Sequence, residues 1–182
     1  MFSTNNLSSV NEKAAMAPGE RVKAQLVEVK VDDQGHFKTV FQNNSGKLTK
    51  TEFMIDPSNP SHNIDAAKAS QERIIHILTA FVPESTFAGV EAPDFKSWCG
   101  MLIAKLGTAY VGKECELKAV VNKKGYVDFP YFPNFISTEF RPLSWTSNPK
   151  YDKYVFPTDT PDVEVDTANA AFDTSNNDVL GF

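Results

Sequence analysis

Lysine and aromatic side chains occur together at several places in this 182-residue chain. Lys38 lies between Phe37 and Phe41 at strand spacing, and a lysine pair at 123–124 precedes a run of tyrosines and phenylalanines. Lysines attract phosphate groups, and aromatic rings offer faces on which bases stack. The combination indicates a surface for single-stranded nucleic acid. The candidate contact residues are Lys38, Phe41, Lys47, Lys50, Lys105, Tyr110, Lys113, Lys123, Lys124, Tyr126, Phe129, Tyr131 and Phe132.

A purely structural role is the alternative for these residues. The phenylalanines would then form the core, and the lysines would lie on the solvated side of the same strands. For any single residue this interpretation is the stronger one. The structural interpretation fits the segment 126–133 less well. Two prolines make this segment edge-like, and its four aromatic residues are more than a core needs there.

The three histidines form no catalytic or metal-binding pattern in the sequence. His36 falls in a predicted strand, His62 in a loop and His76 within the apolar stripe of a predicted helix. The sequence contains no phosphate-binding glycine loop, no GxSxG serine motif and no HExxH zinc motif. We therefore predict that the protein is not an enzyme and uses no catalytic residue, metal or cofactor.

Asp32, Asp33 and Glu52 are the acidic residues on which a small metal-dependent nuclease would rely. Acidic residues that precede a glycine in a hairpin are usually turn residues, which is the simpler interpretation of the aspartate pair. Cys99 and Cys115 lie in apolar surroundings without a second cysteine pair. We predict that they are buried free thiols rather than zinc ligands.

Alternating apolar and polar residues predict the strands that would position the lysines and rings. Three strands are expected at 21–31, 36–43 and 47–55, and a later hairpin at 115–121 and 126–129. In the second strand Phe37, Thr39 and Phe41 share one face. The expected turns are 32–35, 43–46 and 122–125, each of which contains glycine.

Two helices are predicted between these groups of strands. Residues 64–82 carry apolar side chains at spacings of three and four and end at Pro83. Residues 94–106 repeat the pattern, with Asp94 as the N-cap and Gly107 as the stop. The predicted fold class is therefore mainly β with inserted helices, as an OB-like five-stranded barrel. A five-stranded α+β sheet without closure is the alternative.

Charge is distributed unevenly along the chain, whose formal net charge is −5. Residues 21–153 hold 17 Lys and Arg against 15 Asp and Glu, whereas residues 154–182 hold six acids and no Lys or Arg. These shifts predict a flexible arm at 1–19, a nucleic-acid-binding domain at 20–153 and a disordered acidic tail at 154–182. An apolar residue beside a terminal carboxylate suits capture by a partner's pocket. The candidate partner-binding residues of the tail are Asp173, Asp178, Leu180 and Phe182.

An OB-like core followed by an acidic tail that ends in Phe182 resembles the single-stranded DNA-binding proteins of bacteriophage and bacterial replication. The resemblance is closest to the phage type, in which helices interrupt the barrel. It implies sequence-independent binding of exposed strands during DNA replication, recombination and repair. It also implies that the tail recruits replication proteins and competes with DNA for the cationic groove. This tail is less densely acidic than the family pattern, since Asn and Thr are interleaved with its acids.

The predicted partners are thus single-stranded DNA and, through the tail, replication proteins. The oligomeric state is left open, with a homodimer as one option. We predict no membrane partner and a cytoplasmic location, because no run of 18 apolar residues and no secretion signal is present. The main alternative function is a protein–protein adaptor or structural protein whose segment 126–135 binds another protein. A small metal-dependent nuclease is the weaker alternative.

Overall fold

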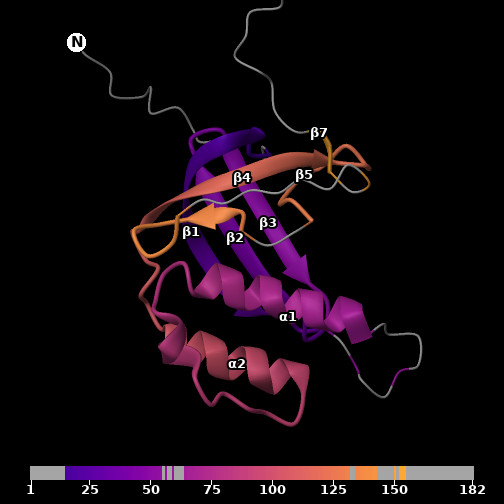
Figure 1. Ribbon diagram of the computed structural model, residues 1–182, viewed down its shortest axis with the longest axis vertical. Helices are drawn as coiled ribbons and strands as arrows, with labels where there is room; N and C mark the ends of the chain where they lie inside the picture. The colour runs from indigo at the N-terminus through magenta and orange to yellow at the C-terminus, as the bar shows by residue number, and fades with distance from the viewer. Residues whose placement is uncertain are drawn as a thin grey trace, which may run out of the picture.

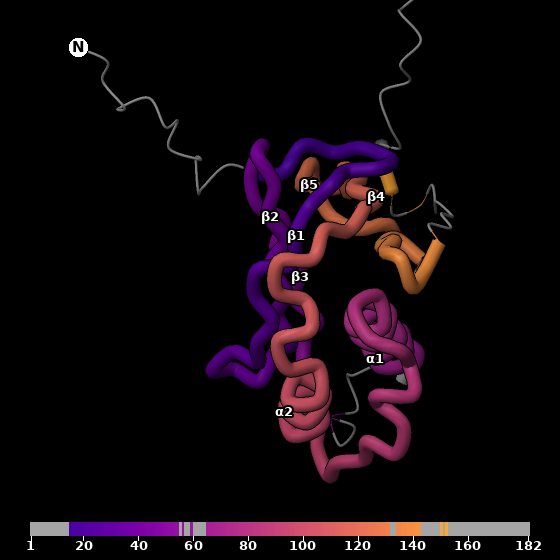
Figure 2. Tube along the Cα trace, turned by 90° about the vertical axis from the view of Figure 1, so that its left-hand side faces the viewer, coloured from indigo at the N-terminus to yellow at the C-terminus, as the bar shows by residue number. Residues whose placement is uncertain are grey.

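A computed structural model of the protein describes residues 15–54, 56, 59, 64–131, 134–142, 150 and 152–154. The described residues form an antiparallel sheet with two α-helices (Figure 1). Both helices lie at the same end of the strands, which the view turned by 90° also shows (Figure 2). None of the described helices is long and apolar enough to cross a membrane.

The sheet is organised around two long strands in its middle. Its strands are β1 (Gly19–Val31), β2 (Phe37–Asn43), β3 (Gly46–Glu52), β4 (Glu114–Asn122), β5 (Val127–Asp128), β6 (Ile136–Ser137) and β7 (Asp152–Tyr154). The main order is β3-β2-β1-β4-β5, and both β6 and β7 also pair with β4. A register shift between Leu26 and Glu28 interrupts the pairing of β1 with β2. The mainly β fold with inserted helices is therefore confirmed.

β3 and β5 stand at the two ends of this order. Among the described residues no backbone pairing joins them, so the sheet is open. An ion pair does cross between them, because Nζ of Lys50 lies 2.9 Å from Oδ1 of Asp128. The two ends of the sheet are thus close in space.

Glycine permits the tight hairpin turn between β1 and β2. Gly35 has a φ of 84°, a conformation that residues with a side chain rarely adopt. Oδ1 of Asp32 accepts hydrogen bonds from the backbone N–H groups of Gln34 and His36, at 3.0 Å each. The bond from His36 is the main reason that the pKa of Asp32 lies below its ordinary value. Asp32 is therefore a turn residue.

The two helices and a short 3₁₀ helix connect β3 to β4. α1 (Ile64–Leu78) and α2 (Phe95–Leu106) flank the 3₁₀ helix η1 (Glu84–Phe87). Asp94 caps α2 by accepting a 2.8 Å hydrogen bond from the Ser97 N–H, and Gly107 ends the helix with a φ of 54°. Both predicted helices are confirmed, although α1 ends four residues before the predicted limit of 82.

The hydrophobic core lies between the inner face of the sheet and the two helices. Its largest fully buried members include Phe37, Phe41, Ile74, Leu102 and Leu117. Thr39 is also buried, so the predicted shared face of β2 is confirmed. Cys99 and Cys115 are buried free thiols as expected, and burial raises the pKa of each to about 12.

Part of the predicted N-terminal arm 1–19 packs against the sheet. Met16 is fully buried, and its N–H donates a 3.0 Å hydrogen bond to the carbonyl oxygen of Lys47. The Ala17 N–H donates to Oγ of Ser45 at 3.1 Å. Residues 15–17 therefore pack against β3 and the turn before it, and the side chain of Met16 joins the core there. The expected arm residues 1–14 lie outside the described residues.

We expect Phe41→Ala to lower the free energy of unfolding by about 3–5 kcal/mol, because it removes a fully buried ring and leaves a cavity. Urea denaturation of the full chain measures this change. Tyr126→Ala is the matched control, since that ring is 69% exposed and its loss should change the free energy by less than about 0.5 kcal/mol. Equal, small effects of both substitutions would contradict the placement of Phe41.

Candidate functional site

One cavity brings together several of the predicted contact residues. We call it the basic groove; it has a volume of about 430 Å³ and lies where β3, α1 and the turn between β4 and β5 meet. Its lining residues are Lys50, Arg73, Asn122, Lys123, Lys124, Asp128, Phe129, Pro130, Tyr131 and Asp152. Four of these are cations and two are carboxylates, so the groove has an excess of positive charge.

β3 contributes to the groove through charged residues on its inner face. Leu48, Lys50 and Glu52 alternate with outward-facing residues, so all three point to the side of the core and α1. Lys50 is bound by Asp128 of β5, whose Oδ1 also accepts a 2.8 Å hydrogen bond from the Phe129 N–H. The Lys50 ammonium is thus held at a defined position at the base of the groove.

Glu52 fixes the arginine of the groove. The Nε and Nη2 atoms of Arg73 donate to the two carboxylate oxygens of Glu52 at 2.7 and 2.8 Å. Ser70 donates to the same carboxylate, which is only 3% exposed. Burial alone would lower the pKa of Arg73, but the hydrogen bonds and charge of Glu52 raise it above its ordinary value. Arg73 therefore remains a cation at the wall of the groove.

The turn between β4 and β5 presents the lysine pair. Oδ1 of Asn122 accepts hydrogen bonds from the backbone N–H groups of Lys124 and Tyr126, at 3.0 and 3.1 Å. Gly125 completes the turn with a φ of 86°. Lys123 and Lys124 are both exposed, and no acidic side chain among the described residues pairs with Lys124. A well-defined backbone thus carries an ammonium group that is available to an anion.

Two tyrosines supply exposed rings beside these cations. Tyr131 is 41% exposed and lines the groove, whereas Tyr126 is 69% exposed and directly follows the turn. The Tyr131 N–H donates a 3.0 Å hydrogen bond to Oδ1 of Asp152, a buried residue of β7 that pairs with Asn122. The backbone below the Tyr131 ring is therefore anchored in the sheet. Both rings are exposed to solvent, as a ring that stacks on a base must be.

Phe41 and Phe129 were wrongly predicted as contact residues. The Phe129 ring stacks on Phe135, with centroids 4.2 Å apart, and meets Phe41 edge-on at 5.4 Å. Phe41 is fully buried and Phe129 nearly so. A ring that is buried in the core cannot stack on a base while the protein stays folded. These phenylalanines form the apolar support below the groove.

Five other predicted contact residues lie away from the groove. Lys38 pairs with Asp32 at 3.6 Å near the β1–β2 turn, and Lys47 lies beside the packed residues 15–17. Lys105, Tyr110 and Lys113 precede β4, whereas the lysine pair follows it. A nine-residue strand spans roughly 30 Å, so the two groups are at opposite ends of β4. The structure therefore does not unite all the predicted residues in one site.

Some predictions fall outside the described residues. These are Phe132, the tail residues Asp173, Asp178, Leu180 and Phe182, and also His62. Tyr154, the first residue of the expected tail, belongs to β7, so this strand crosses the predicted boundary between domain and tail.

The sequence interpretation missed Arg73 as a residue of the groove. One signal was present, because Arg73 directly precedes Ile74 in the apolar stripe of α1. A cation beside a core position usually has an acidic partner. That partner, Glu52, falls in the inward-facing phase of β3, where a charged residue also needs one. Sequence alone did not link two residues that are 21 positions apart.

The acidic residues of the nuclease alternative do not gather. Asp32 is engaged by its turn, and Glu52 by Arg73 and Ser70. Among the described residues, no group of three His, Cys, Asp or Glu side chains is placed to hold a metal ion. Asp32 and Glu52 instead have structural partners.

His76 lies in α1, within its apolar stripe as expected, and is a buried structural residue. Its Nε2 accepts hydrogen bonds from the N–H groups of Asn134 and Phe135, at 3.0 and 3.2 Å. Burial, together with the positive charge of Arg141, lowers its pKa from 6.5 to about 3. The ring is therefore neutral at physiological pH and joins α1 to the segment before β6.

With the geometry of the groove established, comparisons with known proteins add no relative. Neither the known protein-family models, nor the curated proteins, nor the solved structures include a match to this chain. The inference of function therefore depends on the residues of the groove.

His76 should make the stability depend on pH. Its pKa is about 3 in the folded protein and near 6.5 when unfolded, so the unfolded chain binds the extra proton between these values. Stability is then full above pH 6.5 and is lost as the pH falls towards 3. We expect a loss of about 2 kcal/mol between pH 7 and 5 that His76→Gln removes. Urea denaturation of both proteins at the two pH values measures it, and equal pH dependence would contradict the assignment.

Proposed function

We propose that this protein binds single-stranded DNA without sequence preference and without catalysis, and that the basic groove holds the strand. The observation that carries the proposal is the meeting of Lys50, Arg73 and the lysine pair 123–124 with the exposed rings of Tyr131 and Tyr126. A cationic track for phosphates and aromatic faces for bases are the two requirements of such a surface.

The groove is also suited to a strand because its parts are already held in place. Lys50 and Arg73 are fixed by Asp128 and Glu52, and Asn122 fixes the turn that carries the lysine pair. Ordering flexible side chains during binding costs free energy, so a preformed site binds more strongly. The exposed Lys124 ammonium needs no internal carboxylate to be released before it meets a phosphate.

The arrangement of the strands supports an OB-like barrel as part of this proposal. The order β3-β2-β1-β4-β5 places a helical insertion between β3 and β4, and the Lys50–Asp128 ion pair crosses between the ends of the sheet. OB-folds bind oligonucleotides on their second and third strands and on the loops 1–2 and 4–5. The basic groove uses β3 and the β4–β5 turn, which correspond to two of these parts.

The wider role is proposed on the resemblance described above. The protein would coat exposed strands during DNA replication, recombination and repair in the cytoplasm of a phage-infected cell. Its acidic tail, 154–182, would recruit replication proteins. No cofactor is needed for these roles.

An adaptor that binds another protein is the second candidate, and one exposed patch favours it. Phe53 is 66% exposed at the end of β3 and meets the ring of His36 edge-on at 5.1 Å. Met54, also exposed, donates its N–H to Nδ1 of His36 at 2.9 Å. Exposed apolar groups at one place are typical of protein contacts. Such binding would depend on salt far less than binding to phosphates does.

The lysine pair should control the salt dependence of DNA binding. Replacing Lys123 and Lys124 together by Ala should reduce the slope of log affinity against log salt by about 1.4, because each lost phosphate contact accounts for about 0.7 with single strands. Titration of labelled oligo-dT at several salt concentrations measures the slope. A double variant at Lys30 and Lys96 changes the net charge equally outside the groove and should keep the slope. If the affinity of the wild-type protein for oligo-dT did not change with salt concentration, the proposed function would be excluded.

The exposed tyrosines should contribute stacking. Tyr126→Ala or Tyr131→Ala is expected to weaken oligo-dT binding by about 1–3 kcal/mol for each lost stack, with the fold intact. Phe53→Ala is the matched control, because Phe53 lies outside the groove and is 66% exposed, close to the 69% of Tyr126. The same titration, together with a thermal melt, measures both effects. A larger loss of DNA binding for Phe53→Ala than for the tyrosines would place the strand elsewhere.

A further inference from the structure

A second hollow borders α1 on a different face from the basic groove. Its volume is about 460 Å³, and it lies between α1, α2 and the segment 134–142. We call it the arginine–tryptophan hollow after Arg141 and Trp98; His76 and Ile75 also line it, and Lys68 and Glu72 stand at its rim. It holds two side chains with the chemistry of nucleotide recognition, a guanidinium and an indole.

Arg141 differs from the other arginines of the chain in its partners. Its Nη2 donates to Oγ1 of Thr79 at 2.8 Å, and its Nη1 lies against Nδ1 and the carbonyl oxygen of His76. All of these groups are neutral, because burial keeps His76 uncharged. Arg21 and Arg73, by contrast, each bind a carboxylate. No acidic side chain among the described residues pairs with Arg141.

A half-buried guanidinium without a counter-ion is a strong site for an anion. Removing a cation from water costs free energy unless an opposite charge compensates it. Hydrogen bonds to Oγ1 of Thr79 and to the carbonyl oxygen of His76 already orient Arg141, so its planar donors are preorganised for the oxygens of a phosphate. The acid at the rim, Glu72, lies 4.0 Å from Lys68, so it pairs with a cation of its own.

Trp98 provides a flat apolar surface in the same hollow. It lies on α2, is only partly buried and packs at a tilt of 35° to the ring of Phe95. Indole is a good stacking partner for a base, since every base has a π-face. A phosphate on Arg141 and a base on Trp98 would together account for one nucleotide.

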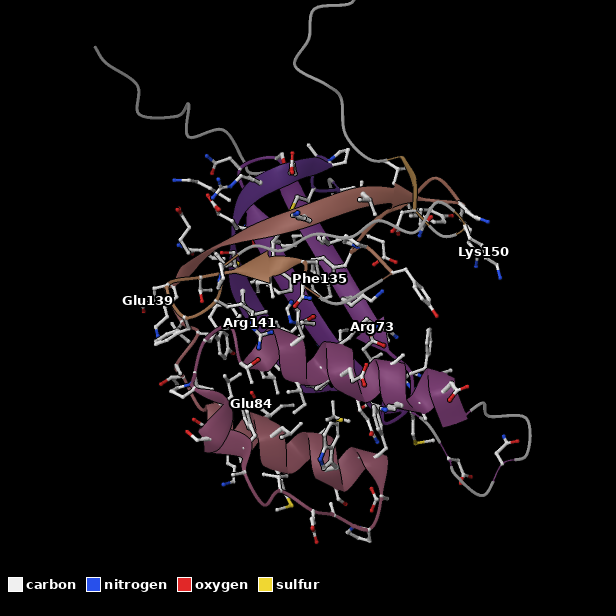
Figure 3. All side chains as sticks on the ribbon, in the orientation of Figure 1. Arg73, Glu84, Phe135, Glu139, Arg141 and Lys150 are labelled. Atoms are coloured by element: carbon white, nitrogen blue, oxygen red, sulfur yellow. The ribbon has the colours of Figure 1, made fainter. Side chains whose placement is uncertain are left out.

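The hollow is also close to the basic groove along α1. Glu72 of the hollow and Arg73 of the groove are adjacent residues. Hydrogen bonds from Asn134 and Phe135 to His76 hold the segment that leads to Arg141 against α1, and one from Thr138 to the carbonyl of Ala80 holds it against the turn that follows the helix. Figure 3 shows Arg73 and Arg141 spaced along α1, with Phe135 above the helix between them.

We propose that the arginine–tryptophan hollow is a second nucleotide-binding site, in which Arg141 binds a phosphate and Trp98 stacks on the adjoining base. One source of the nucleotide is a DNA strand that continues from the basic groove across α1, and in that case the inference rests on the proposed function. A free mononucleotide has the same chemistry and is the other source. A short strand would fill the groove alone, and a longer one would reach both sites.

Tryptophan fluorescence of the full-length chain tests this site. The chain has two tryptophans, Trp98 and Trp145, so a Trp145→Phe background reports on Trp98 alone. We expect quenching by long oligo-dT but much less by a four-nucleotide strand that still binds. Titration with thymidine monophosphate forms the second arm, which identifies a free nucleotide as the ligand.

Arg141→Gln should abolish the quenching and reduce the salt slope for the long strand by about 0.7, the value for one phosphate contact. Lys96→Gln is the matched control: it removes one exposed positive charge from α2 outside both cavities and should change neither readout. A thermal melt verifies that each variant is folded. Arg141→Lys retains the charge and should recover most of the slope, which separates binding from a structural loss.

The outcomes separate this site from the proposed function. Quenching of Trp98 by long oligo-dT, or by thymidine monophosphate alone, supports the second site if it is lost in Arg141→Gln. If the long strand binds through the basic groove but does not quench the fluorescence of Trp98, and if Arg141→Gln has the same salt slope as the wild type, the second site is wrong and the proposed function stands. If neither ligand binds, both proposals are wrong.

Discussion

The buried carboxylate of Glu52 is the interaction on which the position of the candidate site depends. It is almost inaccessible to water and accepts hydrogen bonds from Arg73 and Ser70 of α1. Because an unpaired buried charge is strongly unfavourable, the inner face of β3 and this face of α1 must meet. The same contact brings Arg73 into the basic groove. Because both cavities border α1, the position at which Glu52 holds this helix also sets where they lie.

β4 performs the second organising role, since it pairs with four other strands. It joins β1 in the middle of the sheet and carries β5, β6 and β7 along its length. Its C-terminal end presents the turn with the lysine pair, and its pairing with β7 places Asp152 beneath Tyr131. Exposed rings and cations therefore rest on a paired strand, where their backbone has little freedom.

The cations of this protein divide into two groups by their partners. Lys50 and Arg73 neutralise buried or half-buried carboxylates, so they contribute to the fold as well as to the groove. Lys124 and Arg141 have no acidic partner among the described residues. Cations of the second group gain the most free energy when they bind an anion, because no internal carboxylate competes with that anion. This contrast is informative about function in a chain whose overall charge is negative.

The sequence by itself determined the elements of the fold that depend on local interactions. Alternation predicted β1 to β5 but not the short strands β6 and β7, and apolar spacing predicted α1 and α2. The N-cap Asp94 and the stop at Gly107 were identified correctly because a cap involves neighbouring residues only. The lysine pair at 123–124 was also recognisable, since a hairpin turn exposes its tip.

Only the tertiary structure decided which aromatic rings are core and which are exposed. Phe129 packs on Phe41, 88 positions away, whereas Tyr126 in the same segment contacts solvent. Arg73 and Arg141 depended on the fold in the same way, because the charge that a cation offers to a ligand is set by partners that only long-range packing brings to it.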